Sequence, residues 1–205
     1  MSETAASEVS DRRERPETRE RILSAAADVF AEKGFRQSAV DDIVARSATS
    51  KGSFYHFFRS KEGIFLALLD RFGAVLLGRV ERDVARSSGA LDRVDAALAA
   101  AFAVLEEHRT LARIVVMEAP ALGHGFDPRL FELHRRLASF IAGRLDDAVR
   151  DGSIAPIDTE LAAYAWLGAI HELVLRWLHT GRPDPLTAAV PELRALLLRS
   201  VGARA

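Results

Sequence analysis

Residues 49–58 read T-S-K-G-S-F-Y-H-F-F, a segment that is polar at its front and aromatic at its back, with no acidic residue. A helix that begins near Ser50 would place Phe54 and Phe58, four residues apart, on one buried face. Its remaining side chains can donate hydrogen bonds from the other face: Ser50, Lys51, Ser53, Tyr55 and His56. An anchored underside with exposed donors is typical of a helix that reads base edges in the major groove of DNA.

Two helical patterns precede this segment. Residues 17–33 carry apolar side chains at a helical period, and Gly34 follows as a stop signal. Val40, Ile43 and Val44 indicate a short amphipathic helix, and Ser38 is in position to cap it. A polar turn at residues 46–49 then leads into the third helix. Three short helices with a turn before the third predict a helix-turn-helix domain over residues 17–62.

The run over residues 18–72 resembles the DNA-binding domain of the TetR family of bacterial transcriptional regulators. It contains T-R-E-R-I-L-x-A-A-x-x-x-F-A-E-K-G-F, then V-D-D-I-V, then S-K-G-S-F-Y-H-F-F-x-S-K-E-G-I-F, in this order. Ala39 stands where the family usually has a threonine that caps the second helix and touches phosphate, so we expect Ser38 to take over. Ala48 and Thr49 stand where the family commonly has Gly-Val, which puts a hydroxyl at an ordinarily apolar position.

The resemblance and the donor pattern together give a predicted DNA-binding set. We expect Ser50, Lys51, Ser53 and His56 to approach bases or phosphates, and Tyr55 and Lys61 to grip the backbone. The full set is Ser38, Thr49, Ser50, Lys51, Gly52, Ser53, Tyr55, His56 and Lys61.

Local charge supports specific rather than bulk DNA binding. The chain as a whole has a net charge of -1, but residues 43–61 contain four basic residues and no acid. These are Arg46, Lys51, Arg59 and Lys61. A basic patch on a nearly neutral protein suits binding at selected sites.

Composition excludes several classes of function. The 205 residues are 49% hydrophobic, enough for a core, and include no cysteine, which removes disulfides, thiol catalysis and cysteine zinc sites. The start is polar and charged, so we expect no signal peptide, and no run reaches the roughly 18 apolar residues of a membrane span. We therefore expect a cytoplasmic protein that does not engage a membrane.

Residues 1–16 are small, polar and charged, and they predict a disordered tail. Arg12, Arg13 and Arg15 would then form an arm that reaches into a minor groove, or simply part of a solvated tail whose charge Asp11 and Glu14 dilute.

The remaining sequence predicts further helices and no strands. A long pattern opens at Lys61, with Ser60 as cap, and keeps its period to about residue 87. Further helices are expected over residues 91–108, 109–119, 127–151 and 158–180 and within 185–201. Asp127-Pro128 is a strong start signal, and Pro191 either starts the last helix late or kinks it. The fold class is all-α, with about nine helices and a second domain over residues 63–205.

The last two predicted helices are apolar on more than one face, with Ala162, Ala165 and Ala169 in a stripe and Leu193, Leu196 and Leu197 in a band. Such helices need cover on all sides, which a two-fold dimer provides. The resemblance implies the same homodimer, built by the last two helices. The alternative is an ordinary buried core in a monomer.

The resemblance also implies an effector pocket in the middle helices, with mostly apolar walls. Candidate wall residues are Phe102, Leu105, Met117, Phe140, Tyr164, Trp166, His171 and Trp177, with Arg113 as an anion anchor. Aromatic residues at helical spacing also belong to ordinary cores, and His171 beside Glu172 serves equally to satisfy a core hydrogen bond.

Enzyme interpretations find little support. The six histidines form no H-E-x-x-H pair or other tight metal spacing, and there is no G-x-S-x-G elbow or phosphate-binding glycine loop. We expect no metal and no cofactor. An architectural DNA binder would not need so large a second domain. The sequence thus predicts a homodimeric repressor of a palindromic double-stranded DNA operator, released by a small, largely apolar effector.

Overall fold

The computed structural model describes the backbone of residues 3–118 and 127–203, and the side chains of residues 16–118 and 128–203. Within these ranges the chain forms helices joined by turns and contains no strand, which confirms the all-α prediction. The chain divides into two compact units, Met1–Asp70 and Arg71–Ala205. The division falls inside one helix, a few residues beyond the boundary that the sequence predicted after residue 62.

The first unit contains α1 (Glu3–Lys33), α2 (Val40–Ser47), α3 (Lys51–Phe57) and the start of α4 (Lys61–Val84). Helix α1 begins at Glu3 and includes Pro16, so most of the segment predicted to be a disordered tail is helical. Alanine, glutamate and arginine dominate this segment and are strong helix formers. Arg12, Arg13 and Arg15 lie on this helix, but their side chains fall outside the described residues, so the minor-groove arm stays a prediction.

Three phenylalanines form the centre of the first unit. Phe30 of α1, Phe35 of the following turn and Phe65 of α4 have ring centroids 5.0–5.8 Å apart. All three rings are buried. Edge-to-face and tilted aromatic pairs of this kind stabilise a small core beyond the area they bury. They tie α1 to α4, and the two helices between them are held over this core.

The second helix is capped differently from the prediction. Ser38 does not cap α2, because its hydroxyl donates a hydrogen bond of 2.5 Å to the carbonyl of Gly34 and the residue is buried. The N-cap is Ala39, whose N–H donates to the Asp42 carboxylate at 2.9 Å. The acid at the third helical position thus accepts from the N–H of the cap residue, which is the half of a capping box that needs no side chain on the cap.

The second unit contains the rest of α4 and α5 (Ala90–Glu107), α6 (Arg109–Arg113), a π-helical turn (Ile114–Glu118), α7 (Asp127–Arg150), α8 (Thr159–Thr180), a 3-10 turn (Leu186–Ala189) and α9 (Val190–Ser200). Together with the helices of the first unit, and counted over the described residues, they make nine α-helices, in agreement with the sequence prediction of about nine. The start signals also hold: Asp158 accepts from the Leu161 N–H at 2.9 Å, and Pro191 lies in the first turn of α9 rather than kinking it.

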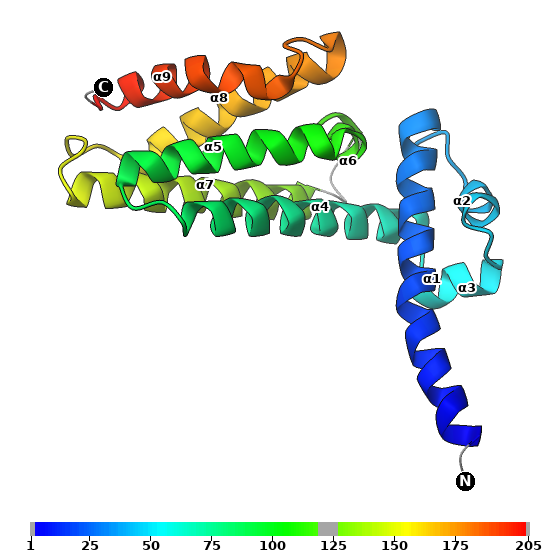
Figure 1. The fold of residues 1–205 in the computed structure, drawn as a ribbon. Coiled ribbons are helices and arrows are strands. Elements are labelled where there is room, and N and C mark those ends of the chain that lie inside the picture. Colours follow the sequence, from blue (N-terminus) through cyan, green and yellow to red (C-terminus); the bar gives the residue numbers. More distant parts are fainter. Residues whose placement is uncertain (1–2, 119–126, 204–205) are drawn as a thin grey trace. The chain divides into compact units, whose positions relative to one another are not determined.

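Helices α5, α7, α8 and α9 pack on one another around the core of the second unit (Figure 1). Trp166 of α8 is buried in this core, and its indole N–H donates to the Ser200 hydroxyl on α9 at 3.1 Å. Leu145 of α7 and Leu197 of α9 belong to the same cluster. The part of α4 after Asp70 lies alongside α5 and α7 and supplies side chains to the cavities described below.

Over residues 3–118 and 127–203, no helix is both long and apolar enough to span a membrane.

Candidate nucleic-acid interface and effector cavity

Helix α3 has the two faces that its sequence predicts. Phe54 is fully buried and Phe58 is nearly so, and their ring centroids lie 6.0 Å apart. On the opposite side Tyr55 is 49% exposed, and its ring packs edge-on against that of Phe54. The other exposed residues of this surface are Ser50, Lys51, Gly52 and His56, while Thr49 and Ser53 are half-buried. We call this exposed set the α3 donor face.

Hydroxyl groups order the entry into α3. The Ser50 hydroxyl caps the helix by accepting from the Ser53 N–H at 3.0 Å, and the two hydroxyls also lie 3.0 Å apart. The Thr49 hydroxyl is 2.8 Å from that of Ser47. Thr49 is therefore engaged within the turn, and Ser50 has a structural role besides any contact with DNA. Gly52 has room for a side chain, since an added Cβ would lie 3.6 Å from the nearest atom, the Ser50 Oγ.

The turn before α3 contains a strained residue. Ala48 has φ 50° and ψ 43°, the left-handed conformation, and it is the C-cap of α2. A Cβ is disfavoured here, which explains why glycine is the ordinary choice for such a position.

Two of the four residues in the basic patch that the sequence predicted are paired with acids from other helices. The Arg46 guanidinium binds Glu32 of α1 through two hydrogen bonds of 2.9 and 2.6 Å. The Lys51 ammonium lies 2.7 Å from Asp41 of α2, and this hydrogen bond raises the pKa of Lys51. The local count of charges was correct, but it could not include acids that the fold brings in from residues 32 and 41.

Lys61 is bound inside the first unit. Its ammonium donates to the carbonyls of Phe35 and Ser38 at 2.7 and 2.8 Å and lies 4.4 Å from the centroid of the Phe35 ring. The predicted grip of this side chain on the DNA backbone does not fit these contacts, because two of its three donor positions are already used. Ser38 likewise turns inward, so neither side chain belongs to the α3 donor face.

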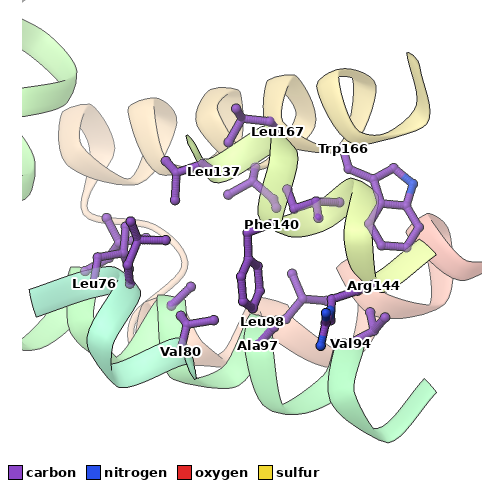
Figure 2. A pocket seen from close by; sticks show the side chains of 15 residues that line it. Leu76, Val80, Val94, Ala97, Leu98, Leu137, Phe140, Arg144, Trp166 and Leu167 are labelled. Atoms are coloured by element: carbon purple, nitrogen blue, oxygen red, sulfur yellow. The ribbon is translucent and has the colours of Figure 1, made fainter. Parts of the chain in front are cut away.

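The second unit encloses an apolar cavity of about 110 Å³ between α4, α5, α7 and α8 (Figure 2). Fourteen of its fifteen lining residues are apolar, and Arg144 is the exception. They are Leu76, Leu77, Val80, Val94, Ala97, Leu98, Ala101, Leu105, Leu137, Phe140, Ile141, Arg144, Trp166, Leu167 and Ile170. We call this the first cavity.

A second cavity of about 100 Å³ adjoins it. The two share the walls formed by Leu76, Leu105, Leu137, Leu167 and Ile170. The second cavity extends toward Phe72, Val115 and Val116, and its polar lining consists of His134 and His171. The two cavities are thus neighbours on either side of shared side chains, with Arg144 in the lining of the first and the two histidines in the lining of the second.

Four of the nine predicted pocket residues line one or both of the two cavities. Leu105 borders both cavities, Phe140 and Trp166 border the first, and His171 borders the second. The other five line neither cavity. Phe102 is buried in the packing of α5, Met117 is half-buried, and Arg113 and Tyr164 are exposed, while Trp177 is buried beneath Arg109, whose Cζ lies 4.6 Å from the ring centroid.

The sequence did not predict the α4 walls or, apart from Phe140, the α7 walls. Leu76, Val80 and Leu137 stand at apolar positions of a helical period, and no sequence signal separates a core leucine from one that borders a cavity. Arg144 was not recognised. It is a charged residue at a position where α7 turns an otherwise apolar face inward, next to Phe140 and Ile141, and that interruption was the available signal.

His171 has a lowered pKa, chiefly because burial penalises its charged form, with a further contribution from nearby His134. The two ring centroids lie 6.3 Å apart. His134 is fixed by a contact of 2.9 Å between its Nδ1 and the Leu130 carbonyl. A neutral imidazole at His171 is compatible with an apolar ligand. Within the described residues, no group of three or more His, Cys, Asp and Glu side chains is placed to hold a metal.

A helix-turn-helix unit with an exposed donor face, followed by a helical unit with an apolar cavity, defines the class of DNA-binding transcriptional regulators. The family model described as bacterial regulatory proteins, tetR family, matches residues 22–68, and the model described as tetracyclin repressor-like, C-terminal domain, matches residues 87–199. The chain belongs to the TetR family of transcriptional regulators, and it is not an enzyme.

Individual relatives cover most of the chain. The fatty acid metabolism regulator protein of Bacillus subtilis is 24% identical over 88% of this chain and 93% of its own. The transcriptional repressor KstR2 of Mycobacterium tuberculosis is 29% identical over 82% of this chain and 83% of its own. The crystal structure of the regulator FadR from Bacillus subtilis in complex with stearoyl-CoA has the same fold, with a TM-score of 0.80 at 24% identity over 90% of this chain and 98% of that one.

Proposed function

We propose that the protein is a homodimeric repressor that binds a palindromic operator through α3 and is released by a fatty acyl thioester or a similar molecule with a long apolar chain. The observation that carries the proposal is the apolar first cavity, whose wall includes Leu76, Leu77 and Val80 of α4 and which adjoins a second apolar cavity. Helix α4 begins at Lys61, within the unit that contains α3. A molecule that moves this wall therefore acts on a helix that is anchored in the DNA-binding unit.

The chemistry of the cavity supports an apolar effector. Its walls are aliphatic and aromatic except for Arg144 and two histidines. Burial of each methylene of an alkyl chain in such a space contributes about 0.8 kcal/mol. One relative is a fatty acid metabolism regulator, and one structure of the same fold contains stearoyl-CoA. These names agree with an acyl chain as the ligand.

The size of the cavity supports a mechanism of release. The first and second cavities measure about 110 and 100 Å³, whereas ligand pockets usually reach roughly 300–1,000 Å³. A long chain therefore fits only if the walls move apart. Binding would then favour a conformation in which α4 is displaced, and the affinity for DNA would fall by the coupling between the two states, typically about 1–3 kcal/mol.

Exposed apolar residues on α8 and α9 support the dimer. Leu161 is 68% exposed and Leu196 is 55% exposed, and Tyr164 on α8 is also exposed. Ala165 and Gly168 continue the exposed face of α8 with small side chains. Apolar and small residues on two adjacent helices suit a self-complementary interface. A dimer would place two α3 helices on half-sites about one helical turn apart, which is why we expect a palindrome.

The test is protection of DNA that flanks the gene of this protein, with and without dodecanoyl-CoA. We expect a symmetric protected region that disappears as the acyl-CoA is added and that coenzyme A alone leaves intact. Protection that dodecanoyl-CoA does not change would contradict the proposed effector, and the absence of any protected symmetric site would contradict the proposed operator.

A further inference from the structure

The two adjoining cavities together extend over a length that suits an alkyl chain. On α7, His134 lines the second cavity and Arg144 the first, with Leu137 shared by both. Ten residues of helix separate these two side chains by about 15 Å at 1.5 Å per residue. An extended chain of single bonds advances about 1.2 Å per bond, as the extended backbone does, so roughly twelve bonds span that distance.

Arg144 carries a buried donor that the protein leaves without a partner. Its Nε–H is buried and has no hydrogen-bond acceptor among the described residues, although the side chain as a whole is 31% exposed. Its guanidinium carbon lies 5.6 Å from the centroid of the Phe140 ring, and Figure 2 draws both among the lining side chains. A buried N–H of a charged group that lacks an acceptor is costly. An oxygen of a bound molecule would remove that cost.

Positive charge surrounds this end of the cavity. The Arg144 Nη2 lies 3.3 Å from Asp147, which also binds Arg150 at 2.6 Å and lies 3.9 Å from Arg93. The carboxylate is thus shared by three guanidinium groups, and all three lower its pKa. Arg93 also contributes to lowering the pKa of Asp151, after the hydrogen bonds that Asp151 receives from Ser153. The local balance favours a ligand with an anionic or strongly polar head.

The opposite end lacks such charge. The Nδ1 of His134 is engaged by the Leu130 carbonyl, and the pKa of His171 is lowered by burial, which favours its neutral form. The ring of His171 also faces His134, and Glu172 acts on it from its own helix. A neutral imidazole at His171, in a lining that also contains Val174 and Leu133, is a poor match for an anion and an adequate one for a methyl terminus.

We propose that Arg144 binds the head oxygen of an acyl ligand, through its Nε, and that the alkyl chain lies along the cavity with its methyl end toward His134 and His171. This inference rests on the proposed function, and it adds the residue that recognises the head and the direction of the chain. The oxygen is a carboxylate oxygen in a fatty acid and the thioester carbonyl oxygen in an acyl-CoA, and the guanidinium donates to either.

The experiment measures binding of dodecanoate, dodecanoyl-CoA, dodecanol and coenzyme A by isothermal titration calorimetry. The proteins are the wild type, Arg144→Met, Arg144→Lys and the control Arg136→Met, which changes an exposed arginine on the same helix. We expect Arg144→Met to lower the affinity for dodecanoate and for dodecanoyl-CoA roughly ten-fold or more, since a hydrogen bond to a charged group contributes about that much to binding. The affinity for dodecanol should change much less. Arg144→Lys should have affinities between those of the wild type and Arg144→Met, and Arg136→Met should bind all ligands as the wild type does.

The outcomes separate the two claims. If the wild type binds the acyl ligands and Arg144→Met, folded by circular dichroism, binds them equally well, the role of Arg144 is wrong while the proposed effector stands. If His171→Gln instead abolishes the preference for the acids over dodecanol, the chain lies in the opposite direction and the inference is overturned. If the wild type binds none of the chain ligands, the proposed effector and this inference both fail.

Discussion

The ammonium of Lys61, at the first residue of α4, donates a hydrogen bond of 2.7 Å to the main-chain carbonyl of Phe35, in the turn that joins α1 to α2. A second bond of 2.8 Å reaches the carbonyl of Ser38 in the same turn. The start of α4 is therefore tied to the segment that leads into α2. A displacement of α4 at this point would strain these two hydrogen bonds.

Replacement of Lys61 with methionine should remove both hydrogen bonds and keep most of the side-chain volume. We expect the free energy of unfolding to fall by about 1–3 kcal/mol, because two carbonyls lose a charged donor. Denaturant titration measures this, and Lys51→Met, at an exposed position, should change the same quantity by less than about 0.5 kcal/mol. A Lys61→Met variant with wild-type stability but a lower salt dependence of DNA binding would show that the side chain serves phosphate instead.

The phosphates of DNA should compete with the Asp41 carboxylate for the ammonium of Lys51. Since Asp41 holds the Lys51 ammonium at 2.7 Å, Asp41→Asn should free the lysine and strengthen DNA binding. Lys51→Ala should weaken binding to any duplex and reduce the slope of log affinity against log salt by about one phosphate. Fluorescence anisotropy at several salt concentrations measures both effects. Glu160→Gln, an exposed acid of the second unit, makes the same change in net charge and should leave affinity unaltered.

Filling the first cavity should block the effector and leave DNA binding intact. Ala101 lines the cavity, whereas Ala99 on the same helix is exposed. Ala101→Leu should therefore occupy part of the space, keep or raise the melting temperature, and weaken dodecanoyl-CoA binding at least several-fold. Ala99→Leu is the matched control and should behave as the wild type. An Ala101→Leu variant that still releases DNA at the same acyl-CoA concentration would place the effector elsewhere.

His171 should make the protein less stable in mild acid. Its pKa is lowered in the folded state, so between that value and the unfolded value of about 6.5 the unfolded chain binds more protons. Stability then rises with pH across this window and is lost as pH falls below about 6.5. His171→Gln should reduce the loss of melting temperature between about pH 7.5 and pH 5.5. An identical pH dependence in the two proteins would show that His171 is not held neutral.

Ala48→Gly should stabilise the protein. The left-handed conformation of Ala48 destabilises the folded state by about 1–2 kcal/mol, because the residue has a Cβ, and glycine removes this strain. Glycine also makes the unfolded chain more flexible, which offsets about 0.5–1 kcal/mol of the gain. The net gain in unfolding free energy should be about 0.5–1 kcal/mol. Ala45→Gly, an exposed position inside α2, should instead lose a similar amount. Equal destabilisation by both substitutions would mean that Ala48 is not strained.

The sequence predicted those features that depend on local periodicity. Phe54 and Phe58 repeat at helical spacing, and both are buried beneath α3 as expected. It failed where a side chain donates to a main-chain carbonyl outside its own helix. Ser38 caps nothing because the Gly34 carbonyl takes its hydroxyl, and Lys61 is bound by carbonyls more than twenty positions earlier, as its separation of 26 from Phe35 shows.

The lining of the two cavities was only partly predictable, because it depends on how the helices pack. Leu105 and Trp166 line the first cavity as expected, but Tyr164 is exposed and Trp177 lies beneath Arg109, since rotation about a helix axis is set by packing rather than by residue type. Arg144 became recognisable only when the fold showed its Nε buried beside apolar walls. A sequence pattern describes which face a helix buries, and it does not describe the space that is left when several helices meet.

The most direct test of the account is sedimentation velocity of the protein with a labelled duplex that carries the footprinted site, before and after addition of dodecanoyl-CoA. The account predicts a complex with the mass of two chains on one duplex, and its dissociation into free duplex and protein when the acyl-CoA is present. A single chain on the duplex, or a complex that persists at saturating dodecanoyl-CoA, would contradict it.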